Sequence, residues 1–129
     1  MSVNSSTHFG FVSSHPVSTL ALSGAPGSAA TITVGGNVHV PVGSVPYMYL
    51  ALTASHDSAA SGVYAEGSWD GGTTWRQTTN ATQYLTASGF TLFQAPIVAP
   101  FMRWRYVNSA SVITTWDGCV YYGLDMVKV

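Results

Sequence analysis

Apolar and polar residues alternate with a period of two over much of the chain, which is typical of strands that bury one face. In residues 101–108, Met102, Trp104 and Tyr106 alternate with Arg103 and Arg105, so one face is apolar and the other carries two arginines. No long stretch keeps the helical period of about 3.6 residues, and turn residues recur about every ten positions. The pattern predicts an all-β chain.

The expected strands are short and separated by turn sequences. Tyr47 to Thr53 is apolar on both faces, which indicates a central strand covered on both sides. Gly35-Gly36 and Asp70-Gly71-Gly72-Thr73 have the composition of tight hairpin turns. We expect a polar loop at 55–62 and a turn at Asp117-Gly118. The predicted strands are 17–22, 31–34, 37–40, 47–53, 63–69, 74–79, 90–94, 101–108, 112–116 and 119–129.

Strands of this number and spacing favour a two-sheet antiparallel sandwich, of which the jelly roll is one form. Residues 1–16 are rich in serine, carry Phe9 and Phe11, and end at His15-Pro16. We expect them to form an extended N-terminal arm that becomes ordered on a partner or on a sister copy. Residues 17–129 are expected to form a single β-sandwich domain.

Charged residues make up only 7% of the 129 residues, with 4 Lys+Arg against 5 Asp+Glu. About 25% is usual for soluble domains. The chain instead has 16 serines and 14 threonines. So few cations argue against nucleic-acid binding and against a polybasic membrane anchor. A neutral hydroxyl-rich surface also lacks the charge that keeps proteins apart, so we expect a protein that works among close neighbours; an extracellular β module has a similar composition.

The N-terminal residues contain no basic segment followed by an apolar run, so a Sec-type export signal is not expected. With Met1 at its start, the chain is expected to be a complete gene product made in the cytosol, although a mature domain placed behind a new Met would look the same. No apolar stretch is long enough for a membrane-spanning helix. The single Cys119 has no partner for an internal disulfide and is expected to be a small buried hydrophobic residue and not a nucleophile.

Residues 68–75 fit the pattern S-x-D-x-G-x-T-W through Ser68, Asp70, Gly72, Thr74 and Trp75. This segment resembles the Asp-box of sialidases and related propellers. The residues themselves describe a structural hairpin: Asp70 bonds to backbone N–H groups, Gly72 takes a positive φ, and Trp75 returns into the core. One box and three arginines do not supply the repeated blades and arginine cluster of a sialidase, so we expect no such enzyme.

A wider resemblance covers residues 63–108. The chain has, in order, Glu66 to Trp75, a polar strand, a strand that begins with glycine, and Ala99 to Asn108. This layout is similar to that of β-sandwich proteins in tailed-bacteriophage virions. In those proteins an "SxDGxxW" hairpin precedes an "apyxRxxy" strand. Capsid decoration proteins, tail components and some carbohydrate-binding domains share this layout.

No cofactor or catalytic fingerprint occurs in the sequence. The histidines His8, His15, His39 and His56 lack the spacing of metal ligands, so neither a metal nor a cofactor is expected. The four tryptophans and seven tyrosines allow a sugar-stacking platform, although most of these rings alternate as core residues do. Arg103 and Arg105 share one strand face. Either this face lies on a solvated edge, or the two cations bind carboxylates of a partner or an acidic ligand.

These features together lead to a hypothesis. The resemblance implies a non-enzymatic virion protein that binds the major capsid protein as a cement or decoration protein on the outer capsid surface, after assembly in the host cytoplasm. We expect it to form a homotrimer, with Phe9, Phe11, Arg103 and Arg105 as candidate partner contacts. The alternative is a phage tail or fibre domain that binds host surface carbohydrate.

Overall fold

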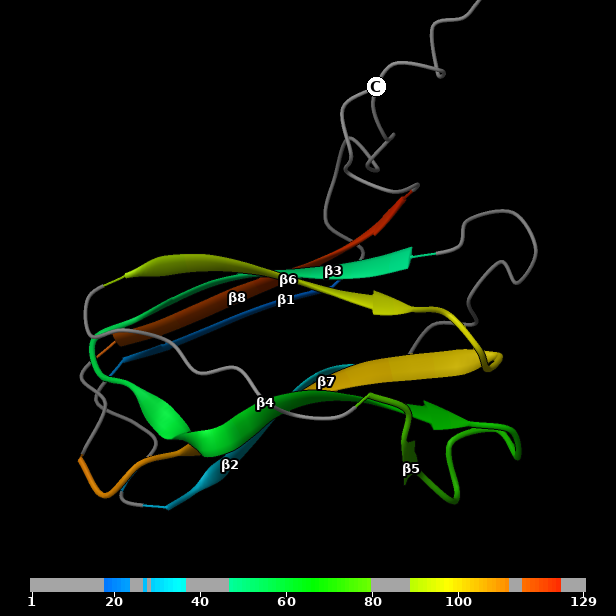
Figure 1. Cartoon of the computed structure of the whole chain (residues 1–129), viewed down its shortest axis with the longest axis horizontal. Helices are drawn as coiled ribbons and strands as arrows, with labels where there is room; N and C mark the ends of the chain where they lie inside the picture. Colours follow the sequence, from blue (N-terminus) through cyan, green and yellow to red (C-terminus); the bar gives the residue numbers. More distant parts are fainter. Residues whose placement is uncertain are drawn as a thin grey trace, which may run out of the picture.

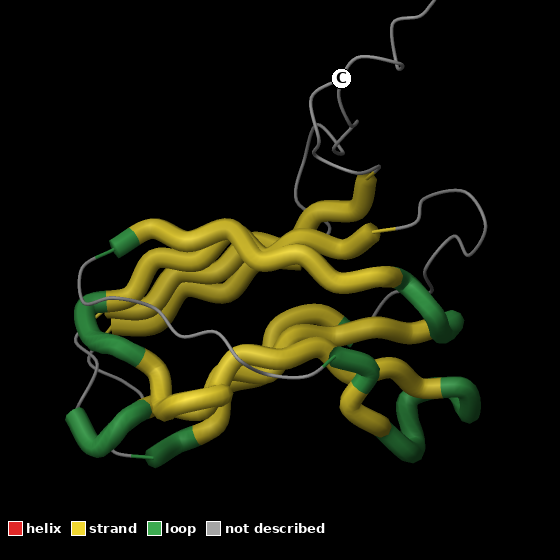
Figure 2. Tube along the Cα trace, in the orientation of Figure 1, coloured by secondary structure: helices red, strands yellow, loops and turns green. Residues whose placement is uncertain are grey.

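A computed structural model describes residues 18–23, 27, 29–36, 47–79, 89–111 and 115–123, and these form eight strands in two sheets. The described residues contain no helix, and the two sheets lie one above the other (Figures 1 and 2). The all-β antiparallel sandwich expected from the sequence is therefore confirmed. The strands are β1 (Ser18–Ser23), β2 (Thr31–Gly35), β3 (Tyr47–Ala54), β4 (Ser58–Ser68), β5 (Arg76–Gln77), β6 (Phe90–Pro96), β7 (Phe101–Asn108) and β8 (Thr115–Gly123).

The strand order identifies the sandwich as a jelly roll. One sheet has the order β1-β8-β3-β6 and the other β2-β7-β4-β5. Strands β1 and β8, β2 and β7, β3 and β6, and β4 and β5 are nested antiparallel pairs, as in one long hairpin whose tip is the β4–β5 turn. Pairing of β3 with β8 and of β4 with β7 rolls this hairpin into two four-stranded sheets.

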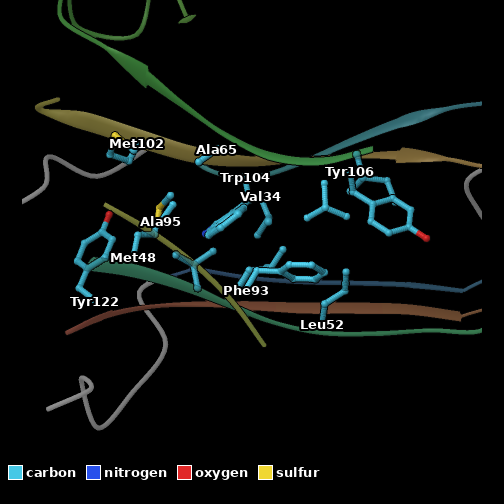
Figure 3. Close-up of a cluster of buried hydrophobic side chains, with 14 of the residues drawn as sticks. Val34, Met48, Leu52, Ala65, Phe93, Ala95, Met102, Trp104, Tyr106 and Tyr122 are labelled. Atoms are coloured by element: carbon cyan, nitrogen blue, oxygen red, sulfur yellow. The ribbon is translucent and has the colours of Figure 1, made fainter. Parts of the chain in front are cut away.

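The core lies between the sheets and is built from alternate residues of the strands (Figure 3). On β7 the inward residues are Met102, Trp104 and Tyr106, as the alternation predicts. The Trp104 ring lies 6.3 Å from that of Phe93, which comes from the opposite sheet. Burying side chains of this size contributes about 1.5–3 kcal/mol each, so this layer is the main source of cohesion between the sheets.

Strand β3 is central, as expected from its apolar faces. It lies between β8 and β6, and its inward residues Met48, Leu50 and Leu52 are fully buried. On its outward face Tyr49 is also only 1% exposed. Its hydroxyl accepts a hydrogen bond from Gln94 Nε2 of β6 at 3.1 Å.

The expected loop at 55–62 is wrong in its second half, because β4 begins at Ser58. Between the pairs Ser58↔Asn108 and Val63↔Tyr106, four residues of β4 (59–62) lie opposite one residue of β7, Val107. This is a large bulge, and a Cβ at Gly62 would lie 2.7 Å from the carbonyl oxygen of Ala59. Polar residues in a bulge look like a loop in the sequence.

The expected turn at Asp117-Gly118 is also wrong, because β8 runs through it without interruption. Gly118 faces the core, where a Cβ would lie 2.6 Å from the Trp116 ring. This glycine therefore makes room for an aromatic ring on its own strand, and Asp117 lies on the outward face with no turn role.

Two strand predictions differ from the structure, one in the length of the strand and one in its pairing. The segment 74–79 contains only the two-residue strand β5. Thr31–Val34 does form a strand, and Gly35 and Gly36 both have φ of 91°, but β2 pairs with β7. Segment 37–40, expected to be its hairpin partner, lies outside the described residues, as does the arm at 1–16 with Phe9 and Phe11.

Candidate functional site

The outward faces of the two sheets differ in chemistry. On β1-β8-β3-β6, the register places apolar and aromatic side chains from all four strands on the face away from the core, and the described part of this sheet contains no Lys or Arg. Phe90 and Leu92 of the edge strand β6 are 68% and 44% exposed. The outward residues are Thr19, Ala21, Tyr47, Tyr49, Ala51, Thr53, Phe90, Leu92, Gln94, Pro96, Asp117, Cys119 and Tyr121. We call this set the apolar face.

The outward face of β2-β7-β4-β5 is polar and holds an ion-pair cluster. Arg103 Nε donates to Glu66 Oε1 at 2.7 Å, and Arg105 Nη1 lies 3.6 Å from the same oxygen. These three side chains are only 14–24% exposed, so the ion pairs are partly desolvated. The alternative of a solvated edge is wrong for these arginines, because β7 lies between β2 and β4.

The β4–β5 turn is organised by Asp70. Ser68 Oγ donates to Asp70 Oδ1 at 2.8 Å, and the backbone N–H groups of Thr73 and Thr74 donate to the same oxygen at 3.1 and 2.8 Å. These bonds lower the pKa of Asp70 from 3.8 to about 2, with the Thr74 N–H as the largest cause. Gly72 has φ of 96° and its N–H donates to Ser68 Oγ at 2.9 Å.

Trp75 does not return into the core, which corrects the sequence expectation. Its Nε1 donates to the carbonyl oxygen of Gly72 at 2.9 Å. Its ring packs on the outward side of the sheet against Arg103, with Cζ of the guanidinium 4.1 Å from the ring centre. Trp69, at the same turn, is 56% exposed. Trp104 and Trp116 are the core tryptophans.

A hollow of about 450 Å³ lies where the β4–β5 turn meets the end of β2 and the start of β7. Four glycines that line it all have positive φ, between 77° and 96°. A Cβ at Gly36 would lie 3.2 Å from the Trp75 ring, so the missing side chain there lets the ring approach. The lining residues are Thr33, Gly35, Gly36, Gly71, Gly72, Trp75, Phe101 and Arg103. This hollow is the candidate binding site.

The other candidate site residues that the structure describes, Cys119 and His56, are not arranged as a reactive group. Cys119 is half-buried on the outward side of β8, less buried than expected, and burial together with the charge of Asp117 raises the pKa of its thiol. Raising the pKa lowers the thiolate fraction, which is unfavourable for a nucleophile. His56 lies in a loop, where its carbonyl oxygen accepts a hydrogen bond from the Tyr106 hydroxyl. His8, His15 and His39 lie outside the described residues.

Within the described ranges, no group of three or more His, Cys, Asp or Glu side chains could hold a metal ion. The same part of the chain has no helix long and apolar enough to cross a membrane.

Sequence reasoning found part of this site and missed the rest. It singled out Asp70, Trp75 and Arg103 from a motif and an alternation, but not the pairing of Glu66 with both arginines. Thr33 and Phe101 were also missed. The register places Gly35, Arg103 and Glu66 in one row across three strands. Glu66 and Arg103 are 37 residues apart in the sequence, so no local pattern reveals this row.

No protein-family model matches the chain, and no curated protein matches its sequence. Among solved structures, the chain is similar to PBSX exported protein XepA, with a TM-score of 0.59 and 16% sequence identity. The match covers 99% of this chain and 41% of that chain, so this chain spans about two fifths of the length of XepA. At this level of identity the likeness is one of fold.

Proposed function

We infer that the chain is a non-enzymatic structural protein of a bacteriophage particle, a cement or decoration protein that binds the outer capsid surface and stabilises contacts between capsomers. The observation that carries this inference is the apolar face. Its edge strand exposes Phe90 and Leu92, and Val98 just beyond β6 is 48% exposed. Among the described strands β6 is the last of its sheet, and exposed apolar side chains grouped on an edge strand are typical of contact surfaces.

Two further features support the proposal. The jelly roll is a fold used by viral capsid proteins, and PBSX exported protein XepA is a solved structure that is similar in fold over nearly the whole chain. Charged side chains are few, and all the described arginines belong to the sheet opposite the apolar face. Docking through the apolar face would therefore desolvate no cation of the described strands, and Asp117 is the one carboxylate of that face.

The proposed mechanism is addition of buried area between capsid subunits. A sandwich seated where capsomers meet contacts several subunits at once, and a homotrimer on a local symmetry axis multiplies these contacts. Each interface can then be modest while the assembly resists internal pressure. Light scattering of the purified protein tests the trimer, because a monomer at high concentration would contradict it.

Capsid binding is tested by cosedimentation with expanded capsids of the phage that encodes the protein. We expect saturable binding, and we expect the double substitution Phe90→Ser and Leu92→Ser to weaken it about tenfold or more because the buried apolar area is lost. Trp69→Ser is the matched control, since Trp69 is a similarly exposed aromatic residue in the β4–β5 turn, at the end of the other sheet. Absence of binding, or an equal loss with Trp69→Ser, would contradict the proposal.

The second candidate function is a phage tail or fibre domain that binds host surface carbohydrate. The hollow beside Trp75 is the observation that favours it. Adsorption of the purified domain to host cells, competed by soluble glycans, separates the candidates, because a capsid cement has no need of a host surface.

A further inference from the structure

We propose that the hollow at the β4–β5 turn is a binding site for an uncharged saccharide, with a pyranose ring placed against Trp75 and Phe101 and its hydroxyl groups on Thr33, Arg103 and the glycine peptide groups. This inference deepens the second candidate function, and it stands independently of capsid binding. A neutral sugar has the mixture of apolar ring faces and hydroxyl groups that this lining offers.

The shape of the hollow depends on backbone without side chains. Gly35 and Gly36 lie on one side and Gly71 and Gly72 on the other, and a Cβ at Gly71 would meet nothing within 4 Å. Backbone without side chains therefore lines two sides of the hollow. The N–H and the carbonyl of Gly72 are already bonded to Ser68 and Trp75, so the peptide groups of Gly36 and Gly71 are the ones that a sugar hydroxyl would meet. The volume of about 450 Å³ lies within the range of about 300–1,000 Å³ for small-molecule sites.

The aromatic wall is held in place before any ligand arrives. Trp75 is half-buried, its Nε1 is bonded to the Gly72 carbonyl, and its ring is stacked on Arg103. Phe101 comes from the first residue of β7, also half-buried. Fixed rings offer apolar area at little cost in conformational entropy, and a pyranose ring presents C–H groups that can pack on them.

The charges around the hollow favour a neutral ligand. Arg103 lines the hollow, but its Nε already donates a hydrogen bond to Glu66 Oε1, and Arg105 Nη1 lies 3.6 Å from the same carboxylate oxygen. Asp70, in the turn that forms one wall, adds a second carboxylate whose low pKa keeps it ionised. Arg103 is the charged residue of the lining, and Glu66 neutralises it; Arg76, next to Trp75 in the chain, is exposed on β5 and does not line the hollow. The lining therefore has no excess positive charge to hold an anion. The remaining N–H groups of Arg103 can serve as donors to hydroxyls.

The test is NMR titration of the full chain with neutral tetrasaccharides of β-linked glucose, β-linked galactose and α-linked mannose, each up to about 10 mM. At least one should shift the indole N–H signal of Trp75, a direct reporter of the wall. A tetrasaccharide of galacturonic acid is the charged counterpart and should bind at least several-fold more weakly than the best neutral probe. No shift with any neutral probe, or tighter binding of the acidic probe, would overturn the proposal.

Variants assign the binding to the hollow. Trp75→Ala should weaken binding about tenfold or more by loss of the stacking surface. Trp75→Ala also removes contacts of the turn, so a second pair of variants leaves both aromatic rings in place. Thr33→Leu removes a lining hydroxyl, and Thr31→Leu makes the same change two residues away on the same face of β2. Both threonines are exposed.

Thr33→Leu should weaken binding about fivefold, the scale of one lost hydrogen bond, while Thr31→Leu leaves it unchanged. Equal effects at the two positions, or binding that survives Trp75→Ala, would sink the assignment to the hollow. Capsid cosedimentation of the same variants keeps the two proposals apart, because none of these three residues belongs to the apolar face.

Discussion

Arg103 joins Glu66 and Trp75 on the outward face of one sheet: its Nε lies 2.7 Å from Glu66 Oε1, while its guanidinium stacks 4.1 Å from the centre of the Trp75 ring. Arg103 and Glu66 face each other across β7 and β4, whereas Trp75 comes from the turn that ends β4. One guanidinium therefore holds the tip of the jelly roll against the sheet.

Removal of this guanidinium should destabilise the protein. Arg103→Ala loses the Glu66 bond and the ring contact, and Glu66, only 14% exposed, keeps Arg105 as a weaker partner. We expect the free energy of unfolding in urea to fall by about 1–3 kcal/mol. Arg76→Ala is the control at an exposed position of β5 and should change it by less than about 0.5 kcal/mol. Equal losses would show that the ion pair and the ring contact have no special role.

Gly118→Ala should destabilise the core by overpacking. The new Cβ would meet the Trp116 ring at 2.6 and 2.8 Å, and Trp116 is only 1% exposed, so the ring cannot move into solvent without cost. We expect a loss of about 1–3 kcal/mol in thermal or urea unfolding.

Two companions test the cause of this loss. Gly27→Ala, where a Cβ meets nothing within 4 Å, should have almost no effect. In the background of Trp116→Phe, which has a smaller ring, Gly118→Ala should cost much less than in the wild type. Strict additivity would mean that the Trp116 ring is not what excludes a side chain at this position.

Asp70 should make stability depend on pH in the acid range. Its folded pKa of about 2 lies below the ordinary value of 3.8, so the ionised carboxylate stabilises the fold above about pH 4, and this contribution fades as the pH falls toward 2. Asp70→Asn should therefore be less stable than the wild type at neutral pH, with a difference that shrinks between about pH 4 and pH 2. Urea unfolding across this range measures it, and a difference that stays constant down to pH 2 would refute the assignment.

Local pattern was sufficient for the fold class and for the faces of the strongest strands. Alternation in 101–108 and the apolar run of 47–53 depend only on which side of a strand each residue occupies, and burial of one side is a property of the residue types themselves. The motif at 68–75 likewise contains every donor and acceptor of its turn within eight residues, so its hydrogen bonds could be anticipated from the sequence.

Pairing between distant strands was decided by the folded structure. Gly118 looks like a turn residue until the Trp116 ring is seen over it, and Trp75 looks like a core residue until Arg103 is found beneath its ring. Glu66 has no sequence neighbour that reveals its two arginines. Register across strands depends on which apolar faces pack together over the whole chain, so contacts that arise from it, including the walls of the hollow, cannot be read from any single segment.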